Sequence, residues 1–160
     1  MKFHEFIQAN LDAIVVEWEA FARTVLPAAK SMSDLALRNH SREILLAIVK
    51  DMQEGQTDAE RVTKSRQVIA ANETIAAAHG ALRQAAGFDI GQVVSEFRAL
   101  RSSVLALWRR REAHDDQGLA IEEIARFNEA IDQALGESVK RYSRDVVASR
   151  DLFLAVVGHD

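Results

Sequence analysis

The chain has no cysteine and only one proline, Pro27, among its 160 residues. The absence of cysteine excludes disulfide bonds, thiolate metal ligands and cysteine nucleophiles. The sequence also lacks a run of about 20 uncharged apolar residues and a basic start followed by an apolar run, so we expect neither a membrane helix nor a secretory signal. Because strand-like alternation between turn dipeptides is missing as well, the sequence predicts an all-α fold.

A large excess of one charge is also missing, because the chain has 20 Lys and Arg residues and 24 Asp and Glu residues, a net charge of -4. This balance provides no general attraction for phosphate backbones or anionic lipid, so nucleic acid and membrane are not expected partners. The basic run Arg109–Arg111 is interpreted as a solvated helix end. One compact domain is the default expectation, because 48% of the residues are hydrophobic and supply a sizeable core. With no cysteine and no export signal, the cytoplasm is the simplest setting.

Apolar residues recur at steps of three and four along most of the chain, which predicts amphipathic helices. The first helix is expected over residues 3–27 and the second over residues 33–54. Residues 57–86 leave open a choice between one helix and two helices joined by a kink, and Gly87 closes this segment. Asp89 followed by Gln92 predicts the start of the next helix.

A polar connector, residues 114–118, precedes a helical pattern that continues from about Leu119 to Val157. Such a helix would be roughly 55 to 60 Å long, so a domain of this size cannot cover its far end. Its apolar residues follow mostly alternating three- and four-residue steps, as in a two-helix seam, and predict a parallel homodimer. The seam residues are Ile131, Leu135, Val139, Tyr142, Val146, Ser149, Phe153 and Val156.

Motifs for catalysis by the chain itself are absent. The sequence has no glycine-rich phosphate loop, no His-Glu-x-x-His and no serine-nucleophile elbow, so this chain alone is not expected to be an enzyme or to hold a cofactor. Its five histidines are too widely spaced for a pair at i and i+4 of one helix, and no metal site is expected.

The C-terminal residues Phe153-Leu154-Ala155-Val156-Val157-Gly158-His159-Asp160 resemble the opening of the histidine-kinase H-box, Phe-x-x-x-x-Ser/Gly-His-Asp/Glu. In that family the motif continues with Leu-Arg and a proline, and the chain stops before this continuation. The resemblance implies that His159 is the phospho-acceptor, whose neutral imidazole attacks the γ-phosphoryl group of ATP. It assigns to Asp160 the role of orienting the imidazole and accepting its proton. The alternative is a solvated His-Asp tail.

A second resemblance covers about Met1 to Arg144. It rests on residues 11–18, on His79-Gly80-Ala81-Leu82-Arg83, on Gly87-Phe88-Asp89 and on Glu96-Phe97-Arg98-Ala99-Leu100-Arg101 followed by Trp108. These residues look like the RsbRD-type N-terminal domain, and related domains in stressosome RsbR proteins have a globin-like helical fold without haem. The resemblance implies a dimeric signal-input module, which in some bacterial kinases directly precedes the phospho-acceptor helix.

The two resemblances together predict a globin-like or bundle-like helical sensor domain over residues 1–115, completed by the first part of a long signalling helix over residues 116–160. The expected function is signal input and dimerisation in a two-component sensor histidine kinase. The parent kinase would use ATP and Mg to phosphorylate His159 and would then transfer the phosphoryl group to the receiver domain of a response regulator. Two alternatives are a stressosome RsbR-type scaffold and a haem or small-ligand sensor of the globin type.

Four residues are candidates for binding a ligand. His79 shares a helical face with apolar residues, and it is interpreted either as an axial haem ligand or as a hydrogen-bonded histidine at the edge of the core. Arg83, Arg98 and Arg101, together with Glu96, predict an ion-pair network across helices, a site for an anionic signal, or partly exposed ion pairs. Trp18, Trp108, Phe97, Phe127 and Phe21 lie on the apolar stripes and are predicted to be core anchors rather than ligand cages.

Overall fold

A computed structural model of the protein describes residues 2–25, 34–54, 74–111 and 117–158. Every secondary-structure element in these ranges is a helix, which confirms the all-α prediction. The choice between one and two helices before Gly87 falls largely outside the described ranges. The first three residues of the polar connector predicted at 114–118 also lie outside them, and its last two residues are the start of the last helix. The helices are α1 (Phe3–Ala9), α2 (Leu11–Val25), α3 (Asp34–Gln53), α5 (Ile75–Ala85), α6 (Ile90–Arg111) and α7 (Gln117–Val157).

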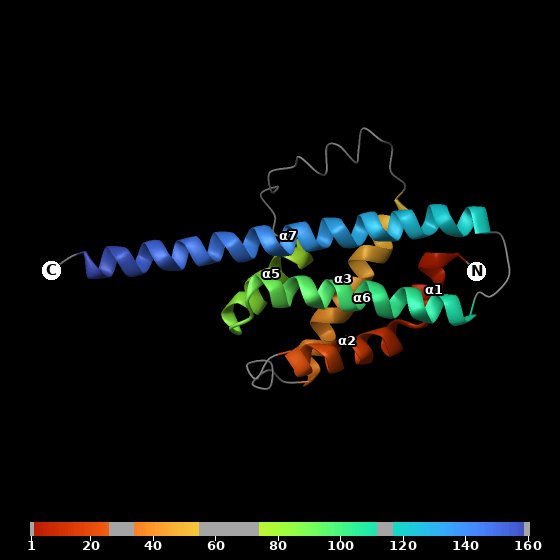
Figure 1. Cartoon of the computed structure of the whole chain (residues 1–160), viewed down its shortest axis with the longest axis horizontal. Coiled ribbons are helices and arrows are strands. Elements are labelled where there is room, and N and C mark those ends of the chain that lie inside the picture. The colour runs from red at the N-terminus through yellow and green to blue at the C-terminus, as the bar shows by residue number, and fades with distance from the viewer. Residues whose placement is uncertain (1, 26–33, 55–73, 112–116, 159–160) are drawn as a thin grey trace.

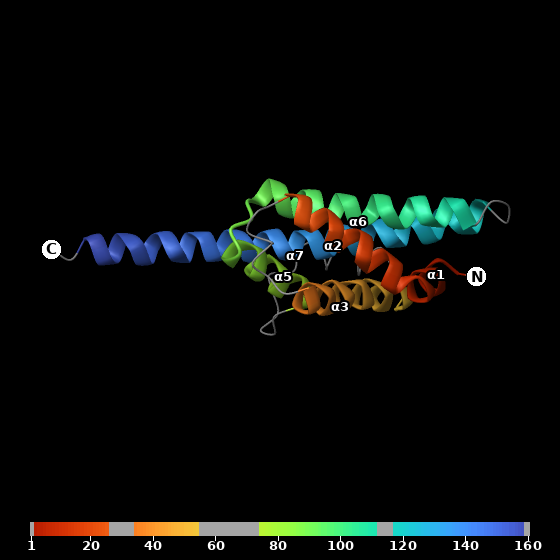
Figure 2. The ribbon, with the colours of Figure 1, turned by 90° about the horizontal axis from the view of Figure 1, so that it is seen from below.

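The long helices α6 and α7 run antiparallel, side by side, and the other helices pack on this pair (Figures 1 and 2). α2 packs against α6 and α3, and α3 also packs against α7. The short helix α5 lies along the middle of α7. The last part of α7 extends well beyond the body, so the C-terminal end is far from the other helices (Figure 1).

The segment expected as one helix over residues 3–27 is two helices, because the chain breaks at Asn10. The Asn10 side-chain amide donates to the carbonyl oxygen of Phe6 at 2.9 Å, and its backbone has the non-helical angles φ -115° and ψ 18°. Asparagine side chains compete for backbone hydrogen bonds in this way and disfavour a helix interior. The Asn10 carbonyl then accepts from the amide of Ile14 in the first turn of α2. The break lets α1 turn over the end of the α6/α7 pair.

Aromatic side chains fill the core where α1 meets α6 and α7. Phe3 packs edge-on against Trp108 and Phe127, with ring centroids 4.8 and 5.0 Å apart. Trp18 and Phe97 form a second aromatic contact farther along the body. Of the five aromatic residues predicted to be core anchors, four are buried and Phe21 is only half-buried. The buried four are Trp18, Phe97, Trp108 and Phe127.

The turn between α5 and α6 has the residues that its geometry requires. Gly87 has φ 87°, in the left-handed region that a side chain disfavours, and the amide of Phe88 reaches back 3.0 Å to the carbonyl of Arg83. Asp89 and Gln92 exchange amide-to-side-chain hydrogen bonds of 2.7 and 2.8 Å, so the predicted helix start is a capping box. This turn directs Phe88 into the core and leads the chain from α5 into α6.

Candidate functional site

Three ionisable side chains meet in the core between α5 and α6. His79 and Arg83 lie one turn apart on α5, and Glu96 comes from α6. His79 Nε2 is 3.1 Å from one carboxylate oxygen of Glu96, and Arg83 Nε donates to the other oxygen at 2.7 Å. The exposed fractions of the three side chains are 0%, 2% and 0%, so water does not screen them. We refer to these residues as the buried triad.

Aromatic rings enclose the buried triad. The His79 ring has Trp18 at 5.8 Å and Phe97 at 5.6 Å between centroids, and the Arg83 guanidinium lies 4.9 Å above the ring of Phe88. A charge in such surroundings is costly unless it is paired and hydrogen-bonded. One carboxylate and one guanidinium balance each other here, and the guanidinium gains a further cation–π contact.

The surroundings set the protonation states of the triad. Burial lowers the pKa of His79 more strongly than its hydrogen bond to Glu96 raises it, so the imidazole is neutral. Burial alone would raise the pKa of Glu96, but the hydrogen bond from His79 and the charge of Arg83 outweigh it and lower the pKa. Since the carboxylate can only accept, the proton of the neutral imidazole is on Nε2, which donates to Glu96.

We expect the stability of the protein to fall as the pH decreases from 7 to 5. A histidine with a lowered pKa in the folded state binds a proton more readily when unfolded, so its contribution is lost as pH drops below its ordinary value of 6.5. Glu96 acts in the same direction below its ordinary value of 4.5. Urea unfolding at several pH values measures this loss, and His79→Gln should flatten the dependence between pH 7 and 5. An unchanged slope in that variant would show that other groups cause it.

The other predicted ligand residues do not join the buried triad. Arg98 is exposed on the outer side of α6, and Arg101 pairs with Asp132 of α7 near the surface. The expectation of partly exposed ion pairs therefore holds for Arg101, whereas Arg83 is in a buried pair. His79 is hydrogen-bonded, but it lies inside the core rather than at its edge. Absorption spectroscopy tests the haem alternative directly. A Soret band in freshly purified protein that is lost in His79→Ala would support haem binding.

α5 makes an unusually close contact with α7. A Cβ atom at Gly80 would overlap the backbone carbonyl of Ser138, at 2.7 Å from its carbon, so only glycine allows this approach. The Ser138 hydroxyl donates to the carbonyl of Ala76 at 2.5 Å. One turn farther along α7, the Tyr142 hydroxyl donates 2.6 Å to the carbonyl of Phe88 in the α5/α6 turn. α7 is thus attached to the two helices that hold the buried triad.

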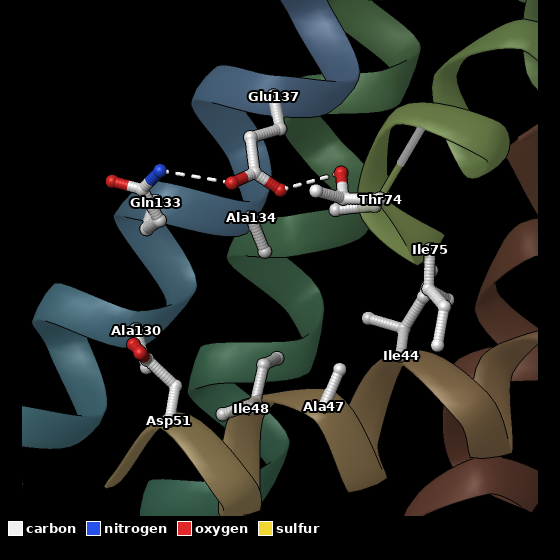
Figure 3. Close-up of a pocket in the computed structure, with 11 residues that line it drawn as sticks. Ile44, Ala47, Ile48, Asp51, Thr74, Ile75, Ala130, Gln133, Ala134 and Glu137 are labelled. Atoms are coloured by element: carbon white, nitrogen blue, oxygen red, sulfur yellow. Dashed lines mark hydrogen bonds between the residues drawn. The ribbon is translucent and has the colours of Figure 1, made fainter. Parts of the chain in front are cut away.

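A cavity of about 240 Å³ lies between α3, the start of α5 and α7 (Figure 3). The N-cap of α5, Thr74, donates its hydroxyl proton to the Glu137 carboxylate at 2.7 Å, and Gln133 donates to the other oxygen at 2.9 Å. Sequence reasoning missed this site, because nothing in the sequence shows that Thr74 begins a helix beside α7. The remaining lining residues are Ile44, Ala47, Ile48, Asp51, Ile75, Ala76, Ala130 and Ala134.

The last part of α7 exposes its apolar residues. Phe153 and Val156 are 65% and 67% exposed, and Leu152, Leu154 and Val157 are also more than half exposed. The predicted phospho-acceptor His159 and its neighbour Asp160 lie outside the described residues. In the ranges that the structure describes, no helix is long and apolar enough to span a membrane, and no three His, Asp or Glu side chains are placed to hold a metal ion.

Comparison of the chain with protein-family models, curated proteins and solved structures gave no match. The two resemblances therefore rest on their own motifs, and the case for a function rests on the geometry of the described helices.

Proposed function

We propose that this chain is the cytoplasmic signal-input and dimerisation domain of a two-component sensor histidine kinase. In this proposal the helical body receives the signal, and α7 passes it to the phospho-acceptor His159. The main support is the continuity of α7, whose 41 residues run from the core into an exposed apolar end. Since a helix that is exposed and apolar requires a covering partner, the end of α7 is suited to an interface.

The predicted two-helix seam divides into two parts. Ile131, Leu135 and Tyr142 pack against the core of their own body, so they are not available to a partner. Val146 and Phe153, in contrast, are exposed and lie seven residues apart on one face. The dimer contact in this proposal therefore begins near Val146, where α7 leaves the body.

The charges beside this shorter seam suit a parallel pair of helices. If Val146 and Phe153 occupy the first core position of successive heptads, Asp145 and Arg150 occupy the two flanking positions that face each other across a parallel dimer. Asp145 accepts a hydrogen bond from Arg141 of its own helix at 2.9 Å, and a partner's Arg150 would add a second cation. Asp145→Arg should weaken the dimer, and the added change Arg150→Asp should restore it.

The extreme end of α7 needs more cover than one partner helix gives. Every residue from Leu152 to Val157 is apolar, so this turn and a half is apolar on all sides. A helix of that kind is buried all round in folded proteins. A two-helix seam leaves Leu154 outside, and we infer that further helices of the parent protein pack there.

The attachment of α7 to α5 offers a route for the signal. Gly80 meets Ser138 and the Phe88 carbonyl meets Tyr142, both just before α7 leaves the body. A small shift of α5 would therefore have to move α7 as well, because close-packed backbones cannot deform independently. Movement of α7 would then change the position of His159 relative to the ATP-binding part of the parent kinase.

Single-cysteine variants test the parallel dimer without interference, because the chain has no native cysteine. We expect Val146→Cys and Phe153→Cys each to form disulfide-linked dimers on mild oxidation, since the same residue faces itself in a parallel seam. Asp151→Cys, on the outer face of the same turn, is the matched control and should stay monomeric on a non-reducing gel. Equal crosslinking at all three positions would indicate random collision and would contradict the seam.

The kinase part of the proposal has its own test. The whole gene product, incubated with labelled ATP and Mg, should acquire acid-labile phosphate that is absent in His159→Gln. Labelling that survives this substitution would move the phospho-acceptor elsewhere. A complete lack of labelling, with a dimer still formed, would favour the stressosome-type scaffold.

A further inference from the structure

The cavity between α3, α5 and α7 combines apolar walls with an oriented acid. Figure 3 shows Glu137 between Gln133 and Thr74 on one side, with Ile44, Ala47 and Ile48 of α3 on the opposite side. The alanines of α7 and α5 leave the space that larger side chains would fill. The lining is therefore mostly apolar, and the Glu137 carboxylate lies on the side where α7 meets the start of α5.

The Glu137 carboxylate is positioned but not neutralised. Its two hydrogen bonds come from an amide and a hydroxyl, and no cation contacts it among the described residues. Each oxygen retains a lone pair for another donor. No lysine or arginine of the described ranges lines the cavity. The site thus attracts a cation and repels an anion.

We propose that this cavity binds a small organic ammonium ion with an apolar body. The ammonium group would donate to Glu137, a charge-assisted hydrogen bond, and the apolar body would lie against the isoleucines of α3. Because a cavity of about 150 Å³ holds benzene, this larger one has room for a ring and a short side chain, or about ten non-hydrogen atoms.

The position of the cavity connects it with the output helix. Glu137 is the residue before Ser138, which meets Gly80, and Thr74 is the N-cap of α5. A ligand on Glu137 would therefore bind beside the N-cap of α5 and next to the close contact between α5 and α7. The binding site stands on its own geometry, and only its role as the signal input rests on the proposed function.

Three probes of nearly the same shape test the charge preference. Titration calorimetry on the 160-residue chain should give saturable binding of 2-phenylethylammonium. The neutral 2-phenylethanol should bind with an affinity lower by about tenfold or more, and phenylacetate should not bind. Equal binding of the alcohol and the ammonium ion, or no saturable binding of the ammonium ion, would overturn the proposal.

Three variants locate the site. Glu137→Gln should lower the affinity for 2-phenylethylammonium about tenfold or more and leave the affinity for 2-phenylethanol unchanged. Ala47→Leu should abolish the binding of both probes by filling the cavity. Glu122→Gln, an exposed acid on the same helix, is the matched control and should bind as the original chain does. Circular dichroism verifies that each variant is folded. Binding that survives Ala47→Leu would place the ligand elsewhere, and none of these results depends on dimer crosslinking or phosphate labelling.

Discussion

Replacing Glu96 with alanine should destabilise the protein by about 3 to 5 kcal/mol, the largest effect that we expect of a single substitution. The carboxylate accepts from both His79 and Arg83 in a region that water does not reach. Its removal takes away the carboxylate that pairs with the buried guanidinium, which costs more than the pair itself contributes. The measurement is the free energy of unfolding in urea at pH 7.

A control and a rescue make the Glu96 result specific. Arg98→Ala removes an exposed charge from the same helix and should change stability by less than about 0.5 kcal/mol. Glu96→Leu combined with Arg83→Met removes both charges of the triad and should recover much of the loss. If Glu96→Ala proved as mild as Arg98→Ala, water would have to reach the buried triad, and the geometry described above would be wrong.

The helices were largely predictable because their signals are local. Asp89 and Gln92 form the expected cap, Gly87 has the left-handed angle that the end of α5 requires, and α7 spans the predicted segment almost to the residue. The break at Asn10 was missed, since its apolar neighbours continue the helical period on both sides. The break becomes visible only in the structure, where the side-chain amide and the backbone amide of Asn10 share the Phe6 carbonyl.

The candidate site was less predictable because it depends on how helices dock. An ion-pair network across helices that includes Arg83 and Glu96 was one alternative, but the sequence did not show that His79 joins this pair or that the pair is buried. Arg98 and Arg101 were grouped with them by charge alone, although Arg98 is exposed and Arg101 pairs with Asp132 of α7. The cavity had no local signal at all, since it arises where alanines of two helices oppose isoleucines of a third.

Replacing Gly80 with alanine should destabilise the protein by at least about 2 kcal/mol, although alanine is the better helix former. The added methyl group would overlap the Ser138 carbonyl, and backbone atoms cannot move aside as a side-chain end can. α5 would have to separate from α7, breaking the hydrogen bond between Ser138 and Ala76. The free energy of unfolding and the exchange rate of the α5 amides measure this change.

The matched control is Gly136→Ala on the facing helix. A Cβ atom there meets nothing within 4 Å, so the substitution should stabilise the protein by about 0.5 to 1 kcal/mol through helix propensity alone. Opposite signs at two helical glycines would show that packing against Ser138, and not backbone flexibility, requires glycine at position 80. Stabilisation by both substitutions would mean that α5 does not approach α7 so closely, and the route proposed for the signal would lose its basis.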